Sequence, residues 1–296
     1  MASETNPRPP VVSVVMPVRN EKRTIVRNLK VITEAMGEGL VDYAALTLDA
    51  PSDGTRELVL RALGRGKDLS KTGLPRTVRR VQSFQDGKII VVEHARPNGK
   101  GTSVVHALQA LREFTPHFDH PNAVSVHVDA DALDLKVEYL VAMAAWTKLS
   151  LYDMLLGRHW EKLAAPIERD GFSDTQSMAG KDQTGFRAIK ASALLPILNC
   201  EGKGVLAPAH LGFDAFLNHL ISPGQVEVPL FHETFGRHVA VSDQHEQNKV
   251  LQRVLAEPAF AKRHAQTLFR QGGIAKLSKW YAFPHEVAKL YRLKRR

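Results

Sequence analysis

The chain has 296 residues, of which 44% are hydrophobic and 24% are charged, a composition typical of globular proteins. No apolar run approaches the roughly 20 residues of a transmembrane helix, the first ten residues lack the apolar core of a secretory signal, and the single cysteine, Cys200, excludes an internal disulfide, so a cytoplasmic location is expected. The 40 Lys and Arg exceed the 31 Asp and Glu, and the resulting charge of +9 favours phosphate-bearing partners over cationic ones.

Strand and helix patterns alternate along the first half of the chain. Residues 11–18 form a nearly continuous β-branched run typical of a buried parallel strand, and apolar residues at helical spacing follow between 25 and 36. Further strands are predicted at 43–49, 88–94 and 123–131, and further helices at 55–63 and 101–114. This alternation predicts an α/β fold with a mostly parallel sheet flanked by helices.

Two segments are unusually basic. Residues 61–80 carry seven basic side chains and one acidic one, and we predict a surface loop there that either contacts an acceptor or is simply solvated. The C-terminal sequence LSKWYAFPHEVAKLYRLKRR mixes aromatic and basic residues. It fits a helix lying on an anionic surface, a membrane or nucleic acid, or an ordinary structural helix with a solvated tail.

Polar residues gather where the predicted strands end. These positions are Asn20 and Glu21, 49–55, 98–100 and 129–131. Because ligands of parallel α/β sheets bind beyond the carboxyl ends of the strands, this coincidence predicts a binding site at that edge.

The segment VHVDADALD places Asp129 and Asp131 two residues apart. In an extended segment such residues point to the same side, so the two carboxylates would face one spot and repel each other without a cation. Mg²⁺ and Mn²⁺ prefer carboxylate oxygens and leave positions for substrate phosphates. The pair therefore predicts a divalent metal site, although a loop with two solvated acids would show the same pattern.

Taken in order, these segments resemble the family 2 glycosyltransferases of the GT-A fold, including polyprenol-phosphate sugar transferases and glucosyl-3-phosphoglycerate synthase-like enzymes. The resembling segments are VVSVVMPVRNEKRTI, LDAPSDGT, PNGKG, VDADA, KDQTGFRAIKASAL and QVEVPLFHETFGRH. They are similar, respectively, to the opening strand with its Asn-Glu turn, the second acidic motif, the lysine-bearing turn, the D-x-D motif, the Gln-x-Gly-Phe-Arg segment and a later basic segment. The resemblance implies a GT-A domain over residues 11–240, between a flexible N-terminus (1–10) and a helical extension (241–296).

The resemblance also implies a metal-dependent glycosyltransferase that uses a nucleoside-diphosphate sugar as donor. Donor contacts are expected from Pro17, Asn20, Glu21, Asp49, Asp53, Lys100, Asp129 and Gln183. The Mg²⁺ or Mn²⁺ ligands are expected to be Asp129 and Asp131, completed by His232 or His238. The expected sugar- and acceptor-side residues are Asp182, Arg187 and Asp214, of which Asp214 is the candidate base.

The sequence departs from the family pattern in the second motif. Leu48 precedes Asp49 where the family usually has two adjacent aspartates, and Pro51 replaces a residue expected to be serine. Base recognition is therefore expected to differ, and the nucleotide need not be UDP or GDP.

Several alternatives stay open at this point. The acceptor is a polyanion such as modified DNA, polyprenyl phosphate or a small phosphorylated acid, and neither stereochemistry nor homo-oligomerisation is decided. A nucleotidyltransferase of similar fold is less favoured, because no glycine-rich loop with Arg and Lys follows the first strand. A non-catalytic nucleotide-binding module is the third alternative.

Overall fold

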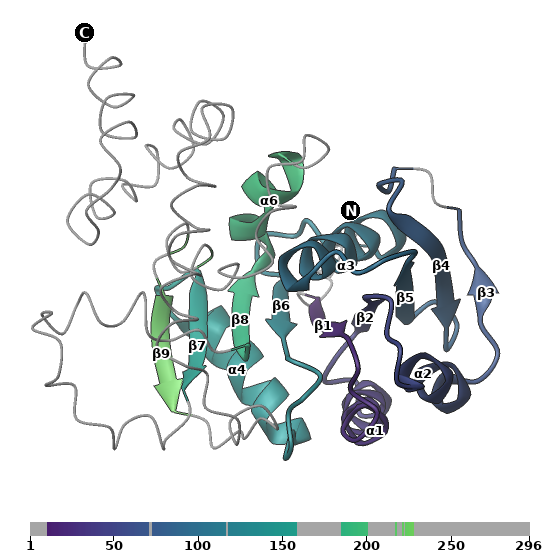
Figure 1. Ribbon diagram of the computed structural model, residues 1–296. Helices are drawn as coiled ribbons and strands as arrows, with labels where there is room; N and C mark the ends of the chain where they lie inside the picture. Colours follow the sequence, from purple (N-terminus) through teal and green to yellow (C-terminus); the bar gives the residue numbers. More distant parts are fainter. Residues whose placement is uncertain are drawn as a thin grey trace, which may run out of the picture.

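The computed structural model describes residues 11–70, 73–116, 118–158, 185–200, 217, 221 and 223–227. The strands in these ranges are β1 (Val12–Val18), β2 (Tyr43–Leu48), β3 (Lys67–Asp68), β4 (Val78–Phe84), β5 (Ile89–His94), β6 (Val124–His127), β7 (Met154–Arg158), β8 (Arg187–Lys190) and β9 (Pro223–Glu227). They form one nine-stranded sheet within the described part of the chain, in the order β3-β4-β5-β2-β1-β6-β8-β7-β9 (Figure 1).

The centre of the sheet is parallel and its flanks are mixed. Strands β5, β2, β1 and β6 run parallel to one another. Strand β4 is antiparallel to β5, β8 is antiparallel to both β6 and β7, and β9 is parallel to β7. The α/β class expected from the sequence is confirmed, and the carboxyl ends of the four central strands meet at one edge, as parallel topology requires.

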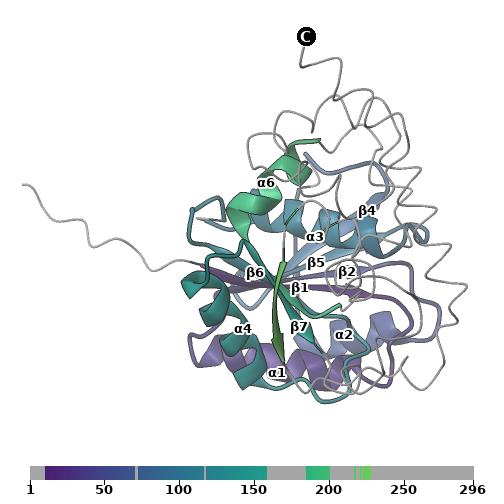
Figure 2. The same ribbon diagram turned by 90° about the vertical axis from the view of Figure 1, so that its left-hand side faces the viewer.

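Helices cover both faces of the sheet. They are α1 (Ile25–Gly37), α2 (Thr55–Leu63), α3 (Lys100–Phe114), α4 (Val137–Leu149) and α6 (Ala191–Cys200). Helices α3 and α6 lie on one face, whereas α1, α2 and α4 lie on the other (Figures 1 and 2). Each face has its own apolar cluster, and both are built from side chains at helical or strand spacing.

Helix α1 illustrates how the sequence produces this packing. Ile25, Leu29 and Ile32 recur three or four residues apart and are almost fully buried against the sheet. Burying each such side chain contributes roughly 1.5–3 kcal/mol. Within the described residues, no helix is both long and apolar enough to cross a membrane.

Two expectations about local structure are corrected. The basic stretch predicted as a loop contains β3 and the start of β4, because Val78 and Val81 are buried while the arginines beside them point outward. Arg80 bridges the two strands through its ion pair with Asp68, whose N–O distance is 2.7 Å. The strand expected over 123–131 ends at His127, so both aspartates of VHVDADALD lie in the turn after β6.

The expected N-terminal segment (1–10) and helical extension (241–296) lie outside the described residues. The division of the chain into those segments and a central domain therefore stays a prediction.

Candidate functional site

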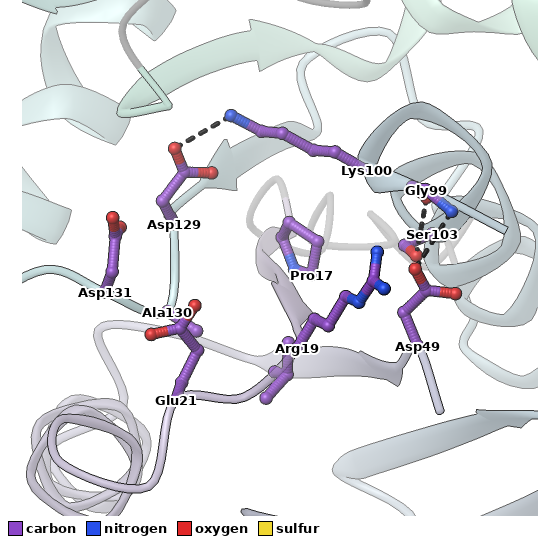
Figure 3. Close-up of a pocket in the computed structure, with 11 residues that line it drawn as sticks. Pro17, Arg19, Glu21, Asp49, Gly99, Lys100, Ser103, Asp129, Ala130 and Asp131 are labelled. Atoms are coloured by element: carbon purple, nitrogen blue, oxygen red, sulfur yellow. Dashed lines mark hydrogen bonds and ion pairs between the residues drawn. The ribbon is translucent and has the colours of Figure 1, made fainter. Parts of the chain in front are cut away.

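A pocket of about 550 Å³ lies at the carboxyl edge of the parallel strands. It is lined by Pro17, Val18, Arg19, Glu21, Asp49, Gly99, Lys100, Ser103, Asp129, Ala130 and Asp131 (Figure 3). The lining comes from the ends of β1, β2 and β6 and from the start of α3, and the volume suits a small-molecule ligand. The site predicted at this edge is therefore present as a cavity.

The turn that carries the two aspartates is held from behind by helix α1. Thr24 Oγ1 donates to the carbonyl oxygen of Ala130 at 2.6 Å, and Asn28 Nδ2 donates to the carbonyl oxygens of Ala130 and Ala132 at 3.0 Å each. Arg27 is the third α1 residue that donates to this turn, with its Nη2 bound to the Ala132 carbonyl oxygen at 2.8 Å. These bonds fix the backbone of the turn while leaving the carboxylates directed at the pocket. Sequence reasoning missed these residues, although Thr24 and Asn28 share a helix face at i, i+4 spacing.

Lys100 contacts one of the two aspartates directly. It is the first residue of α3, and its ammonium group donates to Asp129 Oδ2 at 2.8 Å across the pocket (Figure 3). Both side chains keep about a quarter to a third of their surface exposed (30% and 24%). Gly99 precedes the helix with φ of +87°, a conformation that glycine adopts without strain. The expected lysine-bearing turn is thus a helix start that delivers a cation to the acidic motif.

The contact between Lys100 and Asp129 also depends on Gly185, which lies 56 positions after Asp129 in the chain. A side chain at position 185 would overlap the carboxylate of Asp129, because the Asp129 oxygens occupy the space of the missing Cβ. This glycine belongs to the QTGFR segment, so the motif resemblance contained the signal without revealing its contact.

The carboxylates of Asp129 and Asp131 form a hard oxygen donor set that fits Mg²⁺ or Mn²⁺. Asp131 is only 9% exposed, yet it lines the pocket together with Asp129. Across the ranges that the structure describes, no group of three His, Cys, Asp or Glu side chains is placed to hold a metal, so two aspartates alone do not complete a site. The expected additional ligands, His232 and His238, lie outside the described residues.

Asp49 lies on the opposite side of the pocket and is almost fully buried, at 2% exposure. Its Oδ1 accepts hydrogen bonds from the amide of Asn98 and from His94 Nδ1, both at 2.7 Å, and its Oδ2 accepts one from the amide of Gly99 at 2.9 Å. Burial acts to raise the pKa of Asp49, but the bonds from His94, Asn98 and Gly99 outweigh it and lower the pKa below its usual 3.8. Asp49 is therefore an ionised carboxylate whose acceptor positions are largely used within the protein.

Two other predicted site residues, Asn20 and Asp53, lie away from the pocket lining. Asn20, at φ of +56°, accepts a hydrogen bond from the amide of Ser52 at 2.8 Å and so ties two turns together. Asp53 accepts bonds from the amides of Thr55 and Lys22, at 3.0 and 3.3 Å.

Arg187 is fully buried in β8, opposite His127 of β6, and does not line the pocket. Asp182, Gln183 and Asp214 lie outside the described residues. Their roles, like those of Asn20 and Asp53, stay predictions.

Comparison with known proteins supports the fold. No protein-family model and no curated protein matches the sequence. Solved structures do match, and they define the fold as that of the GT-A glycosyltransferases, as expected from the motifs.

The matched structures include crystal structures of glucosyl-3-phosphoglycerate synthase from Mycobacterium tuberculosis. The complex with UDP has a TM-score of 0.51 at 16% identity, covering 83% of this chain and 79% of that one. The complex with Mn²⁺, UDP and phosphoglyceric acid has a TM-score of 0.50 at 16% identity, covering 86% and 78%. The complex with Mn²⁺, UDP-glucose and glycerol 3-phosphate also has a TM-score of 0.50 at 16% identity, covering 86% and 80%.

Proposed function

We propose that the protein is a metal-dependent glycosyltransferase that transfers a sugar from a nucleoside-diphosphate sugar to a phosphorylated acceptor. The observation that carries this proposal is the pocket in which Asp129, Asp131 and Lys100 converge at the carboxyl edge of the sheet. Two carboxylates and one ammonium group in one cavity suit a ligand that contains both a divalent cation and a diphosphate. The fold shared with an enzyme crystallised with Mn²⁺ and UDP-glucose supports the same conclusion.

The described residues divide the donor between two sides of the pocket. Asp131 and Asp129 would hold Mg²⁺ or Mn²⁺, which when bound neutralises the diphosphate as it leaves. Lys100 and the amino-terminal end of α3 add positive charge beside the same phosphates. Pro17 and Val18 provide an apolar wall, and Asp49 retains acceptor capacity for one donor group of the nucleoside.

The chemistry required of the chain is stabilisation of the leaving diphosphate and activation of an acceptor oxygen. Lys100 can do the first, because its ammonium group is held beside Asp129, where the diphosphate would carry negative charge as it leaves. If the reaction inverts the configuration at the anomeric carbon, Asp214 is the candidate base that removes the proton from the attacking hydroxyl group.

Among the acceptors, a small phosphorylated acid is best supported. The net charge of +9 favours anions, and the structures of similar fold hold phosphoglyceric acid or glycerol 3-phosphate. Modified DNA and polyprenyl phosphate are also negatively charged. Each is therefore tested as a separate acceptor.

The test is a product assay with Mn²⁺ and a panel of UDP-, GDP- and ADP-sugars. Each donor is incubated with 3-phosphoglycerate, polyprenyl phosphate or hydroxymethylated DNA, and an excess of chelator serves as control. Release of nucleoside diphosphate that depends on the metal and on one acceptor is the expected result. In a separate reaction the protein is given a nucleoside triphosphate and a sugar phosphate. Release of pyrophosphate there would instead identify a nucleotidyltransferase. Binding of nucleotide without turnover on any acceptor would contradict the transferase assignment.

A further inference from the structure

Behind the pocket, a buried chain of hydrogen bonds links strand β2 to the middle of helix α3. Asp49 Oδ1 lies 2.7 Å from His94 Nδ1, and His94 Nε2 lies 2.8 Å from His106 Nδ1. The two imidazole rings meet edge to face, at 86° with centroids 4.9 Å apart. All three side chains are at most 4% exposed. The proposed chemistry uses neither histidine.

The other hydrogen bonds of Asp49 connect this buried network to the turn that precedes α3. The amides of Asn98 and Gly99 both donate to the Asp49 carboxylate, at 2.7 and 2.9 Å, and Lys100 is the next residue. The geometry of the turn that starts α3 therefore depends on where the Asp49 carboxylate points. Ser103 also holds the turn from within α3, because its hydroxyl donates to the Gly99 carbonyl at 2.9 Å.

His94 is the residue able to hold that carboxylate in place. Asp49 directly follows β2 and reaches the turn through its side chain, so the groups that donate to its carboxylate determine how that carboxylate is oriented. A third donor, His94 Nδ1, shares Oδ1 with the Asn98 amide and comes from the neighbouring strand β5. His106 in turn fixes the ring of His94 from the helix side.

The charges around the chain are compatible with this role. Burial and the neighbouring His94 lower the pKa of His106 to about 3, so its ring is neutral near pH 7. Glu93, the buried residue before His94, is already neutralised by Arg56 of α2 at 2.8 Å. Asp49 is thus the acid that contacts His94, and the bond between them is not shared with Glu93.

We propose that His94 is a positioning residue for donor binding: through Asp49 it holds the Asn98–Gly99 turn in the shape that directs Lys100 into the pocket. His106 supports it by fixing the ring. The role in donor binding rests on the proposed function, whereas the effect of His94 on the Asn98–Gly99 turn does not depend on it.

Two substitutions at one position separate the two bonds of His94. In His94→Asn the side-chain amide can occupy the place of Nδ1 and keep the bond to Asp49. In His94→Gln the amide reaches the place of Nε2, which keeps the bond to His106 and loses the one to Asp49. Val92→Ala is the matched control, because Val92 is a buried neighbour on β5, on the same side as His94, and does not line the pocket.

The first measurement is amide hydrogen exchange of Asn98 and Gly99 in the full chain without nucleotide. We expect exchange about tenfold faster in His94→Gln than in the wild type, and near wild-type exchange in His94→Asn and Val92→Ala. The second measurement is calorimetric titration with UDP and Mn²⁺, where His94→Gln should bind about five- to tenfold more weakly and His94→Asn should recover most of the affinity.

Unchanged exchange of the Asn98 and Gly99 amides in His94→Gln would overturn the proposal. Equal changes in this exchange in His94→Asn and His94→Gln would overturn it as well. If the turn loosens as expected but the wild type binds none of UDP, GDP or ADP, the positioning of the turn stands and the proposed function fails. If the turn loosens and UDP affinity stays the same, His94 does not position the donor site, and the proposal fails while the transferase assignment survives.

Discussion

The two sides of the pocket use the same residue type in opposite ways. On one side, Asp49 is 2% exposed and accepts hydrogen bonds from two backbone amides and a histidine. On the other side, the side chain of Asp129 is 24% exposed, and its ion pair with Lys100 leaves most of its acceptor capacity to the cavity. Both aspartates follow a parallel strand, so their place in the sheet does not distinguish them.

The difference shows that the hydrogen-bond partners of a carboxylate decide its role in such a site. A carboxylate whose acceptor positions are mostly used by the protein shapes the backbone around the ligand, whereas one with open acceptor positions can bind a cation or a ligand donor. Asp49 thus acts mainly on the turn that precedes α3, while Asp129 and Asp131 line the side of the pocket where we propose that a metal binds. Substitutions on the two sides should consequently separate stability from ligand binding.

The largest effect is expected from Asp131→Ala. Loss of one of two metal-facing carboxylates should lower donor turnover by about 100-fold or more and leave the fold intact, because the residue sits in a turn at the pocket. Turnover and Mn²⁺ affinity are measured on the same samples. Asp119→Ala is the control, because Asp119 is an exposed acid that follows α3 and pairs with Arg112 near the end of that helix. Near wild-type turnover at saturating Mn²⁺ would move the metal away from this motif.

Gly185→Ala tests the same side without removing any functional group. The new methyl group would collide with the Asp129 carboxylate and displace it from Lys100, so metal-dependent nucleotide affinity should fall by about 10- to 100-fold. Gly37→Ala is the matched control, because no atom lies within 4 Å of a Cβ there. Titration of UDP and Mn²⁺ into both variants decides the matter, and equal affinities would show that Asp129 can move without consequence.

Asp49→Asn tests the buried side through stability. The side-chain NH2 group of asparagine would replace one of the two acceptor oxygens and face the amide of Asn98 or of Gly99 as a second donor, so the free energy of unfolding should fall by roughly 1–3 kcal/mol at pH 7. The pKa of Asp49 is lowered in the folded protein, so the stability from its ionised form is complete above pH 3.8 and is lost as the pH falls through the folded-state pKa.

Urea unfolding of both proteins between pH 7 and pH 3 measures this. The gap between wild type and Asp49→Asn should be full at neutral pH and narrow below pH 3.8. A gap that stays constant over the whole range would mean that the ionised carboxylate is not what stabilises the turn.

The smallest effect is expected from Lys100→Ala. Its loss should weaken binding of nucleoside diphosphate by about 1–1.5 kcal/mol, because a partly exposed charge is screened by water, and should barely change the free energy of unfolding. Lys30→Ala, an exposed lysine of α1, is the control for the loss of net charge. Equal affinity of wild type and Lys100→Ala for UDP in calorimetry would remove Lys100 from the donor site and leave it only as the partner of Asp129.

Local sequence patterns were sufficient to predict the central βα alternation, the GT-A resemblance and the edge at which the acids gather. Periodicity of apolar residues is a local property, and it placed β1, β2, β5 and α1–α3 within one or two residues. It failed at 61–80, where charged residues masked the short edge strand β3 and the start of β4, and at the aspartate turn, where the strand pattern ran past its true end at His127.

Contacts between distant parts of the chain determine which carboxylate oxygens already accept hydrogen bonds and which space around them is already filled. The bond from His94 to Asp49 spans 45 positions, and Lys100 reaches Asp129 across 29. These contacts follow from the order and register of the strands, which local patterns do not encode. The same holds for Gly185, whose missing side chain is filled by a carboxylate from another element. Residue types at strand ends therefore predict where a ligand binds, whereas long-range hydrogen bonds and packing decide which of those residues are free to bind it.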